Sequence, residues 1–304
     1  KDCKEKGGYL TLDDLKNYKV IERKPLQVTY NDYTIATNPT PATGGSLIAF
    51  QLKLLKKLAL KQYGFGSGQH LHYLANVMRL TAASRAEILD QKLYEDTVLS
   101  EFLDDNYLSK VRSQLPKFDD LLGSTTHISV ADAAGNVAAM TTSHGQGCGY
   151  VVPDTDIMLS NMLGEADLNP LGFHRWASNQ RITSMMSPTL VFKNQQPVAA
   201  MGSGGANRIR SAITQVILNY IEFGASPQDA VRLPRMHWDR NILDIEPNFL
   251  AENIAKIQLP NEQKRTVWEQ QNMFFGGVHS LFVGAEGQWL GVPDARRAGV
   301  TLAV

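Results

Sequence analysis

The residues with the clearest chemical potential form a short run near the middle of the chain, Ser124-Thr125-Thr126-His127. A polar loop precedes this run, and a segment with alternating apolar residues follows it. If the bond between Ser124 and Thr125 is cut, Thr125 becomes a chain start with a nucleophilic hydroxyl and an α-amine that can take its proton. An N-terminal threonine activated by its own amine is a known catalytic arrangement. Threonine also favours strands, so this run by itself is weak evidence.

A second run consists of small residues, Gly202-Ser203-Gly204-Gly205-Ala206-Asn207, and joins an expected strand to an expected helix. Small residues leave backbone N–H groups uncovered, and a helix N-terminus adds partial positive charge. Such a turn can stabilise an oxyanion. A tight strand-to-helix connection explains the same residues equally well.

Four further polar side chains lie where they could serve a site near Thr125. Ser143 ends the strand that is expected to pair with the strand of Thr125, so its hydroxyl could bond the new α-amine. Asn161, Glu165 and Ser184 lie near loops and strand ends, where they could grip the head of an amino-acid-like ligand. Each of the four also has an ordinary structural explanation.

The elements that would position these residues follow from hydrophobic periodicity and turn signals. Helices are expected over Ser46–Leu58, about 69–90, about 208–223 and Pro227–Val231. A cluster of helix-breaking residues that ends at Gly45 precedes the first of them. Two strands are expected within 26–36, followed by three hairpins: Ile128–Ala131 with Val137–Thr141, Thr189–Phe192 with Val198–Met201, and Ser280–Val283 with Trp289–Val292. Helices come first and antiparallel strands follow, which predicts an α+β layered architecture.

The bulk composition excludes several classes of function. The chain has 304 residues, of which 43% are hydrophobic and 20% charged, as is typical of globular proteins. Lys and Arg together number 30, as do Asp and Glu, so nothing indicates a nucleic-acid partner. No apolar stretch approaches the ~20 residues that cross a bilayer. The two cysteines, Cys3 and Cys148, form neither a disulfide framework nor a zinc pattern.

Other motifs give no support for a metal or an organic cofactor. His70 and His72 lack a third ligand at a sensible spacing and are expected to be a surface pair on a helix. The glycine-rich segments of the chain do not have the G-x-G-x-x-G spacing of a dinucleotide-binding loop. The first six residues contain no apolar segment of a signal peptide and look like a helix cut in mid-course, so we expect missing upstream sequence. Localisation stays open between a prokaryotic cytoplasm, the periplasm and secretion.

The order of motifs along the chain resembles the γ-glutamyltranspeptidase family of N-terminal nucleophile hydrolases. The motifs that carry the resemblance are Gly7-Gly8-Tyr9-Leu10-Thr11, Pro39-Thr40-Pro41-Ala42-Thr43-Gly44-Gly45, Thr125-Thr126-His127-Ile128-Ser129-Val130, Ser187-Pro188-Thr189, Gly202-Ser203-Gly204-Gly205, Pro234-Arg235-Met236-His237 and Asp294-x-Arg296. No single motif is decisive, but the ordered set is highly specific.

The resemblance implies a fold and a processing event. The fold would be a four-layer αββα sandwich, one large domain built from two segments that stay associated after the chain cuts itself between Ser124 and Thr125. Residues 1–124 would be the C-terminal part of the family's large subunit, and residues 125–304 its small subunit. A homodimer is compatible with this assignment.

The resemblance also assigns roles at the reaction centre. Thr125 falls at the nucleophile, and Thr141 and Ser143 fall where the family has hydroxyls that contact it. Gly205 and Ala206 fall at the two-glycine oxyanion turn. Ala206 departs from the family pattern in its side chain but keeps the backbone N–H.

The donor-binding residues match less well. Glu165 falls near the family aspartate that holds the glutamyl α-amine, and Ser184 falls at the first serine of a pair that holds the α-carboxylate. Met185 replaces the second serine, and Gly145 stands where well-known members carry an asparagine. The nucleophile machinery is therefore better matched than the donor pocket.

The implied activity is transfer of a γ-glutamyl group from a glutathione-like donor to water, an amino acid or a peptide. Two alternatives stay open at this stage. One is an acylase on the same scaffold with another acyl donor, of the glutaryl or β-lactam type. The other is an inactive, truncated family member, which would remain a single uncut chain.

Overall fold

The centre of the molecule is a six-stranded antiparallel sheet. The computed structural model describes residues 2–112 and 124–303. The strands of this sheet, in spatial order, are β1 (Leu26–Tyr30), β2 (Tyr33–Thr37), β7 (Thr189–Lys193), β8 (Gln196–Gly204), β12 (Gly277–Val283) and β13 (Trp289–Val292). Every neighbouring pair is antiparallel.

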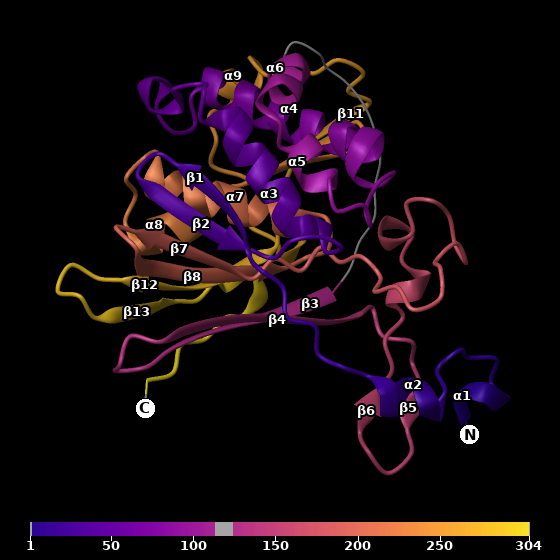
Figure 1. The fold of residues 1–304 in the computed structure, drawn as a ribbon. Coiled ribbons are helices and arrows are strands. Elements are labelled where there is room, and N and C mark those ends of the chain that lie inside the picture. The colour runs from indigo at the N-terminus through magenta and orange to yellow at the C-terminus, as the bar shows by residue number, and fades with distance from the viewer. Residues whose placement is uncertain (1, 113–123, 304) are drawn as a thin grey trace.

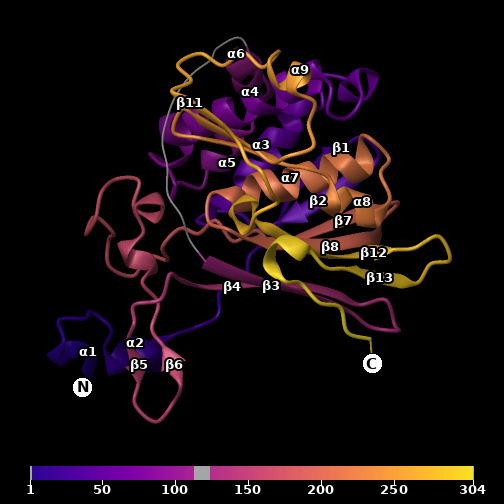
Figure 2. The same ribbon diagram turned by 180° about the vertical axis from the view of Figure 1, so that it is seen from behind.

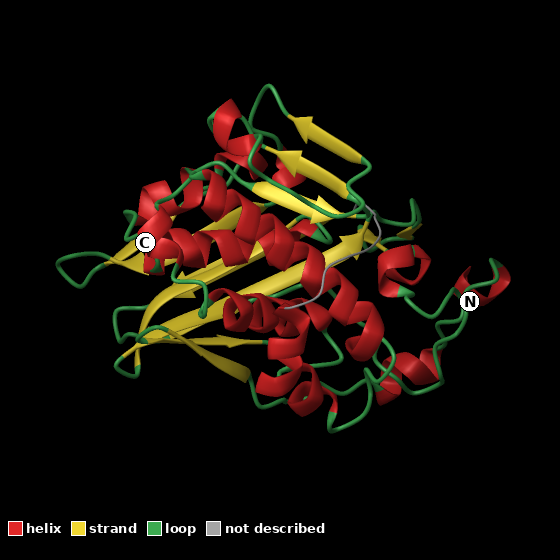
Figure 3. Cartoon of the chain, turned by 90° about the horizontal axis from the view of Figure 1, so that it is seen from above, coloured by secondary structure: helices red, strands yellow, loops and turns green. Residues whose placement is uncertain are grey.

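A layer of helices covers one face of this sheet (Figures 1 and 3). It consists of α3 (Thr43–Leu55), α7 (Arg208–Ile221) and α8 (Pro227–Arg232), with α4 (Gly68–Ser84) packed on α3. Helix α7 is buried at every position from Arg208 to Asn219 because it lies between the sheet and the other helices. The apolar side chains of these helices and of the sheet form one continuous core.

A two-stranded ribbon lies against the opposite face of the sheet (Figure 1). It pairs β3 (Ser124–Ala131) with β4 (Val137–Gly145). The ribbon approaches β8 closely because Gly202 has no side chain: a Cβ there would overlap the His127 ring. Ile128, Val130 and Met140 are exposed on the ribbon.

A smaller sheet and several short elements surround these layers. The smaller sheet contains β9 (Met236–Asp239), β10 (Ile242–Ile245) and β11 (Lys264–Val267). The short helices are α1 (Asp2–Glu5), α2 (Leu12–Asn17), α5 (Val98–Phe102), α6 (Asp105–Arg112) and α9 (Ala251–Ile254), and the two shortest strands are β5 (Val151–Val152) and β6 (Ile157–Met158). In Figures 1 and 2 α1 and α2 lie beside β5 and β6, away from the main body.

Single turns of helix complete the list of elements. They are the 3-10 turns η1 (Leu60–Tyr63), η3 (Met162–Gly164), η4 (Ala166–Leu168), η5 (Met273–Phe275) and η6 (Ala295–Arg297), together with the π turn η2 (Arg85–Leu89).

The three expected hairpins and the helix near 208–223 are confirmed. Two boundaries differ from expectation. Helix α3 begins at Thr43 and not at Ser46, because tertiary hydrogen bonds from Thr43 and Gly44 fix the first turn. The helix expected over about 69–90 is α-helical only to Ser84 and then widens into η2. Among the described residues, no helix is long and apolar enough to cross a membrane.

Candidate active site

The ribbon places the hydroxyl of Thr125 beside that of Ser143. Thr125 Oγ1 donates a hydrogen bond to Ser143 Oγ at 3.2 Å, and Ser143 Oγ accepts another from the N–H of Gly145 at 3.0 Å. The β3–β4 register shifts between Ser124 and Thr126, so Thr125 sits in an irregularity of the ladder. Such irregularities re-aim side chains and are common next to active sites.

The small-residue turn lies directly against the nucleophile candidate. A Cβ added at Gly204 would overlap the carbonyl oxygen of Thr125, so only glycine allows this approach. The hydroxyl of Ser203 donates to the carbonyl oxygen of Gly204 at 2.7 Å. This bond fixes the orientation of the peptide group that carries the N–H of Gly205.

Gly205 and Ala206 follow with positive φ angles of 123° and 49°. Within residues 2–112 and 124–303, neither N–H donates a hydrogen bond to another group. Both precede the first turn of α7, whose N-terminus adds partial positive charge. Two free amides in this position can hold a developing oxyanion.

A small cavity of about 20 Å³ lies between the turn and Thr125. Its lining brings together five residues that the sequence singled out: Thr125, Ser143, Glu165, Ser184 and Ala206. These residues come from β3, β4, the segment between η3 and η4, the loop before β7 and the turn before α7. Their convergence makes this cavity the candidate active site.

Two carboxylates face this cavity. Glu165 Oε1 and Asp167 Oδ2 are buried, and neither has a hydrogen-bond partner in the part of the chain that the structure describes. Burial, and secondarily the charge of Asp167, raises the pKa of the Glu165 carboxyl. Asp167 is not among the site residues expected from the sequence, although the spacing of two acids in Glu165-x-Asp167 could have indicated it.

Arg85 holds Asp167 in place from the helix layer. Its Nη1 donates to Asp167 Oδ1 at 2.9 Å, and its Nη2 donates to the Asp167 carbonyl oxygen at 2.8 Å. Its Nε donates to Asp90 at 3.1 Å. Arg85 opens the π turn η2, and such turns are frequent at functional sites.

Two neighbouring side chains occupy the space beside Gly145. Gly145 has a φ of 65°, and a Cβ there would overlap Glu165 Oε1 and Asn161 Oδ1. Asn161 Oδ1 also accepts from the N–H of Gln146 at 2.7 Å. Glu165 and Asn161 therefore fill the space that an asparagine at position 145 would need.

The N-terminus of α3 fixes the loop that carries Ser184. The Ser184 carbonyl oxygen accepts from the N–H groups of Thr43 and Gly44 at 2.9 and 3.3 Å. Ser184 Oγ accepts from the N–H of Met186 at 3.0 Å. Met185, at the position of the second serine, is buried. The residues Thr43-Gly44-Gly45 therefore open α3 and hold the loop of Ser184, and do not form a chain break.

The hydroxyl of Thr141 contacts His127, whereas that of Ser143 contacts Thr125. The Thr141 hydroxyl is 2.7 Å from His127 Nδ1, while His127 Nε2 is 2.9 Å from the hydroxyl of Ser129. Burial lowers the pKa of His127 to about 4, with a smaller effect from His279. A neutral His127 therefore joins the two strands of the ribbon, and Thr141 supports the site through this ring.

The sequence profile of the γ-glutamyltranspeptidase family matches residues 1–304. The chain belongs to the γ-glutamyltranspeptidase family. It is 31% identical, over an alignment of 331 residues, to the glutathione hydrolase proenzyme of Bacillus subtilis strain 168, with 98% of this chain and 56% of that protein covered. It is 27% identical to the Acylase ACY 1 proenzyme of Pseudomonas sp. strain V22, with coverage of 98% and 55%.

Solved structures of γ-glutamyltranspeptidase relatives agree with the fold. A cephalosporin acylase from Bacillus halodurans superposes with a TM-score of 0.77 at 22% identity, covering 98% of this chain and 56% of that one. The expected α+β fold of the N-terminal nucleophile hydrolase type is therefore confirmed. This family member spans about half the length of the relatives it matches.

The expectation of a surface histidine pair is wrong for His70, which is buried where α4 packs against its neighbours. His70 Nδ1 accepts from the N–H of Gly66 at 3.0 Å, whereas His72 Nδ1 accepts from the N–H of Gln258 at 3.1 Å. Within the described ranges, no group of three or more His, Cys, Asp or Glu side chains is arranged to hold a metal ion. Cys3 and Cys148 are free thiols.

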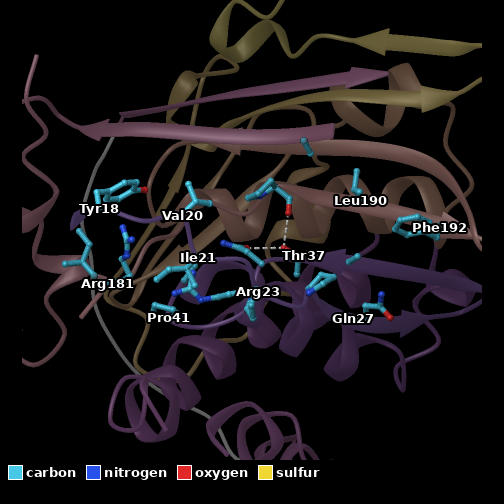
Figure 4. Close-up of a pocket in the computed structure, with 18 residues that line it drawn as sticks. Tyr18, Val20, Ile21, Arg23, Gln27, Thr37, Pro41, Arg181, Leu190 and Phe192 are labelled. Atoms are coloured by element: carbon cyan, nitrogen blue, oxygen red, sulfur yellow. Dashed lines mark hydrogen bonds between the residues drawn. The ribbon is translucent and has the colours of Figure 1, made fainter. Parts of the chain in front are cut away.

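A larger cavity, of about 630 Å³, lies between the segment 18–25, β2 and β7 (Figure 4). Its charged lining residues are Arg23 and Arg181, and Arg181 stacks over the Tyr18 ring at 4.6 Å. The Thr37 hydroxyl is 3.2 Å from Asn38 Oδ1 and 3.3 Å from the Pro188 carbonyl oxygen. The lining contains neither Thr125 nor a carboxylate, so the smaller cavity remains the better candidate for chemistry.

Proposed function

We propose that this chain carries the reaction centre of a self-cleaving γ-glutamyl hydrolase and transferase, with Thr125 as nucleophile. The observation that carries the proposal is the single cavity lined by Thr125, Ser143, Glu165, Ser184 and Ala206. These are the residue types that the reaction needs: a hydroxyl with a polar partner, an anionic group for an amine, and a backbone turn for an oxyanion.

The first reaction is the cut between Ser124 and Thr125. Thr125 Oγ attacks the carbonyl carbon of Ser124, and the acyl group moves from nitrogen to oxygen. The resulting ester leaves Thr125 with a free α-amine. Water then hydrolyses the ester, which releases the carboxylate of Ser124 and the hydroxyl of Thr125. The hydrogen bond between Thr125 and Ser143 supports the required orientation of the hydroxyl.

The second reaction uses the new chain start. The α-amine of Thr125 takes the hydroxyl proton as Oγ attacks the γ-amide carbonyl of a glutathione-like donor. The N–H groups of Gly205 and Ala206 hold the oxyanion, and loss of one such donor typically costs about 2.7–4 kcal/mol of barrier. The protonated amine then releases its proton to the leaving amine. Water or the amine of an amino acid or peptide takes the γ-glutamyl group from the ester.

The acidic side of the cavity favours a donor with an ammonium group. Glu165 and Asp167 each present a buried oxygen that lacks a partner among the described residues. A γ-glutamyl head supplies an α-ammonium group that can satisfy both. Ser184 offers its hydroxyl, and Asn161 its amide, to the rest of the head.

Replacement of the nucleophile tests the proposal. On a denaturing gel, the active protein should give two fragments, residues 1–124 and 125–304, and should hydrolyse a γ-glutamyl anilide. Thr125→Ala should give one uncut band and no hydrolysis, because both reactions need the same hydroxyl. Thr125→Ser should keep part of each. Continued cutting of Thr125→Ala at this bond would refute the proposal.

An acylase with a different donor is the second candidate. Met162, Met185 and Met186 make part of the cavity apolar, and a relative bears the name acylase. A glutaryl amide has no ammonium group, so it would leave Glu165 and Asp167 unpaired. We therefore expect the γ-glutamyl anilide to be cut faster than a glutaryl anilide. The reverse order would favour the acylase, and an uncut chain without turnover would indicate an inactive family member.

A further inference from the structure

Arg297 lies against the rear of the oxyanion turn. It ends the turn η6, and its side-chain stem crosses Gly277, where a Cβ would lie 2.6 Å from the Arg297 Cβ. Its Nη1 is 3.3 Å from the Cβ position of Gly204, and its Nη2 is 3.4 Å from that of Gly205. The guanidinium group therefore lies along the peptide that carries the N–H of Gly205.

The same arrangement brings Arg297 close to the nucleophile. The Cβ position of Gly204 that faces Arg297 Nη1 also overlaps the carbonyl oxygen of Thr125. Three glycines, at 204, 205 and 277, leave the room that the Arg297 side chain occupies. A side chain at any of the three would collide with Arg297 or press on it. The present position of the Arg297 side chain therefore requires glycine at all three positions.

The side chain of Arg297 has no hydrogen-bond or ion-pair partner in the described part of the chain, and its Nε is buried and unsatisfied. Its backbone N–H donates to the Asp294 carbonyl oxygen at 3.3 Å. Its neighbour Arg296 differs, because it bonds Glu246 and Asp294. The second oxygen of Asp294 accepts from Arg235 at 2.7 Å. The nearby acids thus form their hydrogen bonds with other arginines. Asp294 attracts Arg297 only through space, and burial outweighs this attraction and lowers the pKa of the Arg297 guanidinium.

A partly buried cation that no acid bonds directly is unfavourable for folding. Removing a guanidinium group partly from water without a partner costs free energy, and a buried polar atom without a hydrogen bond calls for an explanation. Features that lower stability are commonly retained at functional sites because activity needs them.

We propose that Arg297 is a positioning residue whose positive charge, acting through the Gly204–Gly205 peptide, stabilises the oxyanion in both self-cleavage and turnover. A positive charge behind the peptide group strengthens the attraction between the peptide N–H and a developing negative charge. The effect is larger where water is excluded. This inference rests on the proposed roles of Thr125, Gly205 and Ala206. It adds a residue that does not touch the substrate.

A purely structural role for Arg297 makes a different prediction. If the side chain only packed its stem over Gly277, its loss would lower the melting temperature and would affect activity through misfolding. If its charge serves the oxyanion, removing the charge should relieve an unfavourable interaction. The melting temperature should then stay the same or rise while the reaction slows.

The test compares Arg297→Met, which keeps the stem and removes the charge, with Arg297→Lys, which keeps a charge. The exposed Arg175, replaced by Met, serves as control. We measure the rate of self-cleavage, the melting temperature, and kcat and KM per cleaved molecule with a γ-glutamyl anilide. Arg297→Met should lower the cleavage rate and kcat about tenfold, less than loss of a direct oxyanion donor. KM should stay within about twofold, Arg297→Lys should recover most of the loss, and Arg175→Met should match the parent.

Two results would overturn the inference. One is an Arg297→Met variant with the parent's kcat and cleavage rate. The other is an equal loss in the Met and Lys variants together with a lower melting temperature. The proposed function is tested separately by Thr125→Ala: if that variant is inactive and uncut while Arg297→Met behaves as the parent, only the inference about Arg297 fails.

Discussion

At the scale of single residues, the donor side of the cavity depends on a compensating pair. Gly145 leaves a space that Glu165 and Asn161 fill, so a side chain at position 145 would displace both. A glutamate side chain is one methylene longer than an aspartate. It can therefore reach a cavity that the shorter side chain would not reach from the same backbone position.

Neutralising this acid should weaken binding of a donor that carries an ammonium group. Glu165→Gln should raise KM for a γ-glutamyl anilide by about 10-fold or more, because a charge-assisted hydrogen bond contributes about 1.5–3 kcal/mol. The KM of a glutaryl anilide, which has no amine, should change little. The exposed Glu269, replaced by Gln, is the matched control. An equal rise in KM for both donors would contradict a role in amine recognition.

The same carboxyl should set the acidic limit of donor binding. Burial raises the pKa of Glu165, so the carboxyl takes up a proton at a higher pH than an ordinary glutamate would. As pH falls, its attraction for the donor ammonium should therefore disappear above the range expected for a free glutamate. The rise of KM at low pH should be smaller in Glu165→Gln, which has no carboxyl to protonate.

At the scale of elements, the contact between β3 and β8 fixes the position of Thr125, the proposed nucleophile. Gly204→Ala would force a Cβ onto the Thr125 carbonyl oxygen, so β3 would have to move. A displacement of about 1 Å at a reaction centre can cost about 100-fold in rate. We expect self-cleavage, followed on a denaturing gel over time, to slow by at least that factor.

Gly164 provides the control for this substitution. A Cβ at Gly164 meets open space, and its backbone does not need a positive φ. Gly164→Ala should therefore cut at the parent's rate. Normal cutting by Gly204→Ala would show that the close approach of β8 to Thr125 is not needed.

Elements with strong local signals could be predicted from the sequence, and elements held by tertiary contacts could not. The hairpin of β3 and β4 has a turn that forms locally, in which Asp132 accepts from the N–H groups of Ala134 and Asn136. By contrast, β9 to β11 are four residues long each, and β10 pairs with β11 in parallel across a loop. Short strands of this kind have little periodicity, and their pairing depends on neighbours distant in sequence.

At the scale of the whole molecule, three buried histidines link stability to pH. Burial lowers the pKa of His70, His127 and His237 to about 4 in the folded protein. In the unfolded chain a histidine takes up its proton near pH 6.5. The unfolded state therefore binds more protons between pH 6.5 and 4, and the folded state loses stability as pH falls through this window.

Urea unfolding at several pH values would measure this loss. The unfolding midpoint should be steady above about pH 7 and should fall progressively toward pH 4. His70→Gln should make the fall shallower, because one of the three groups no longer titrates. The exposed His174, replaced by Gln, should leave the slope unchanged. A midpoint that does not change between pH 7 and 4.5 would contradict the assignment of neutral buried histidines.

The sequence alone determined the family and indicated the candidate nucleophile and the candidate oxyanion turn. These depend on residues adjacent in the chain, whose types and order are read directly. Only the tertiary structure decided which distant residues join them: that Asp167 and Glu165 face the cavity of Thr125, that Arg85 holds Asp167 across 82 positions, and that Thr141 serves His127. Local sequence encodes hydrogen bonds within a turn or a helix, but a cavity forms where separate layers pack, and that packing is a property of the whole chain.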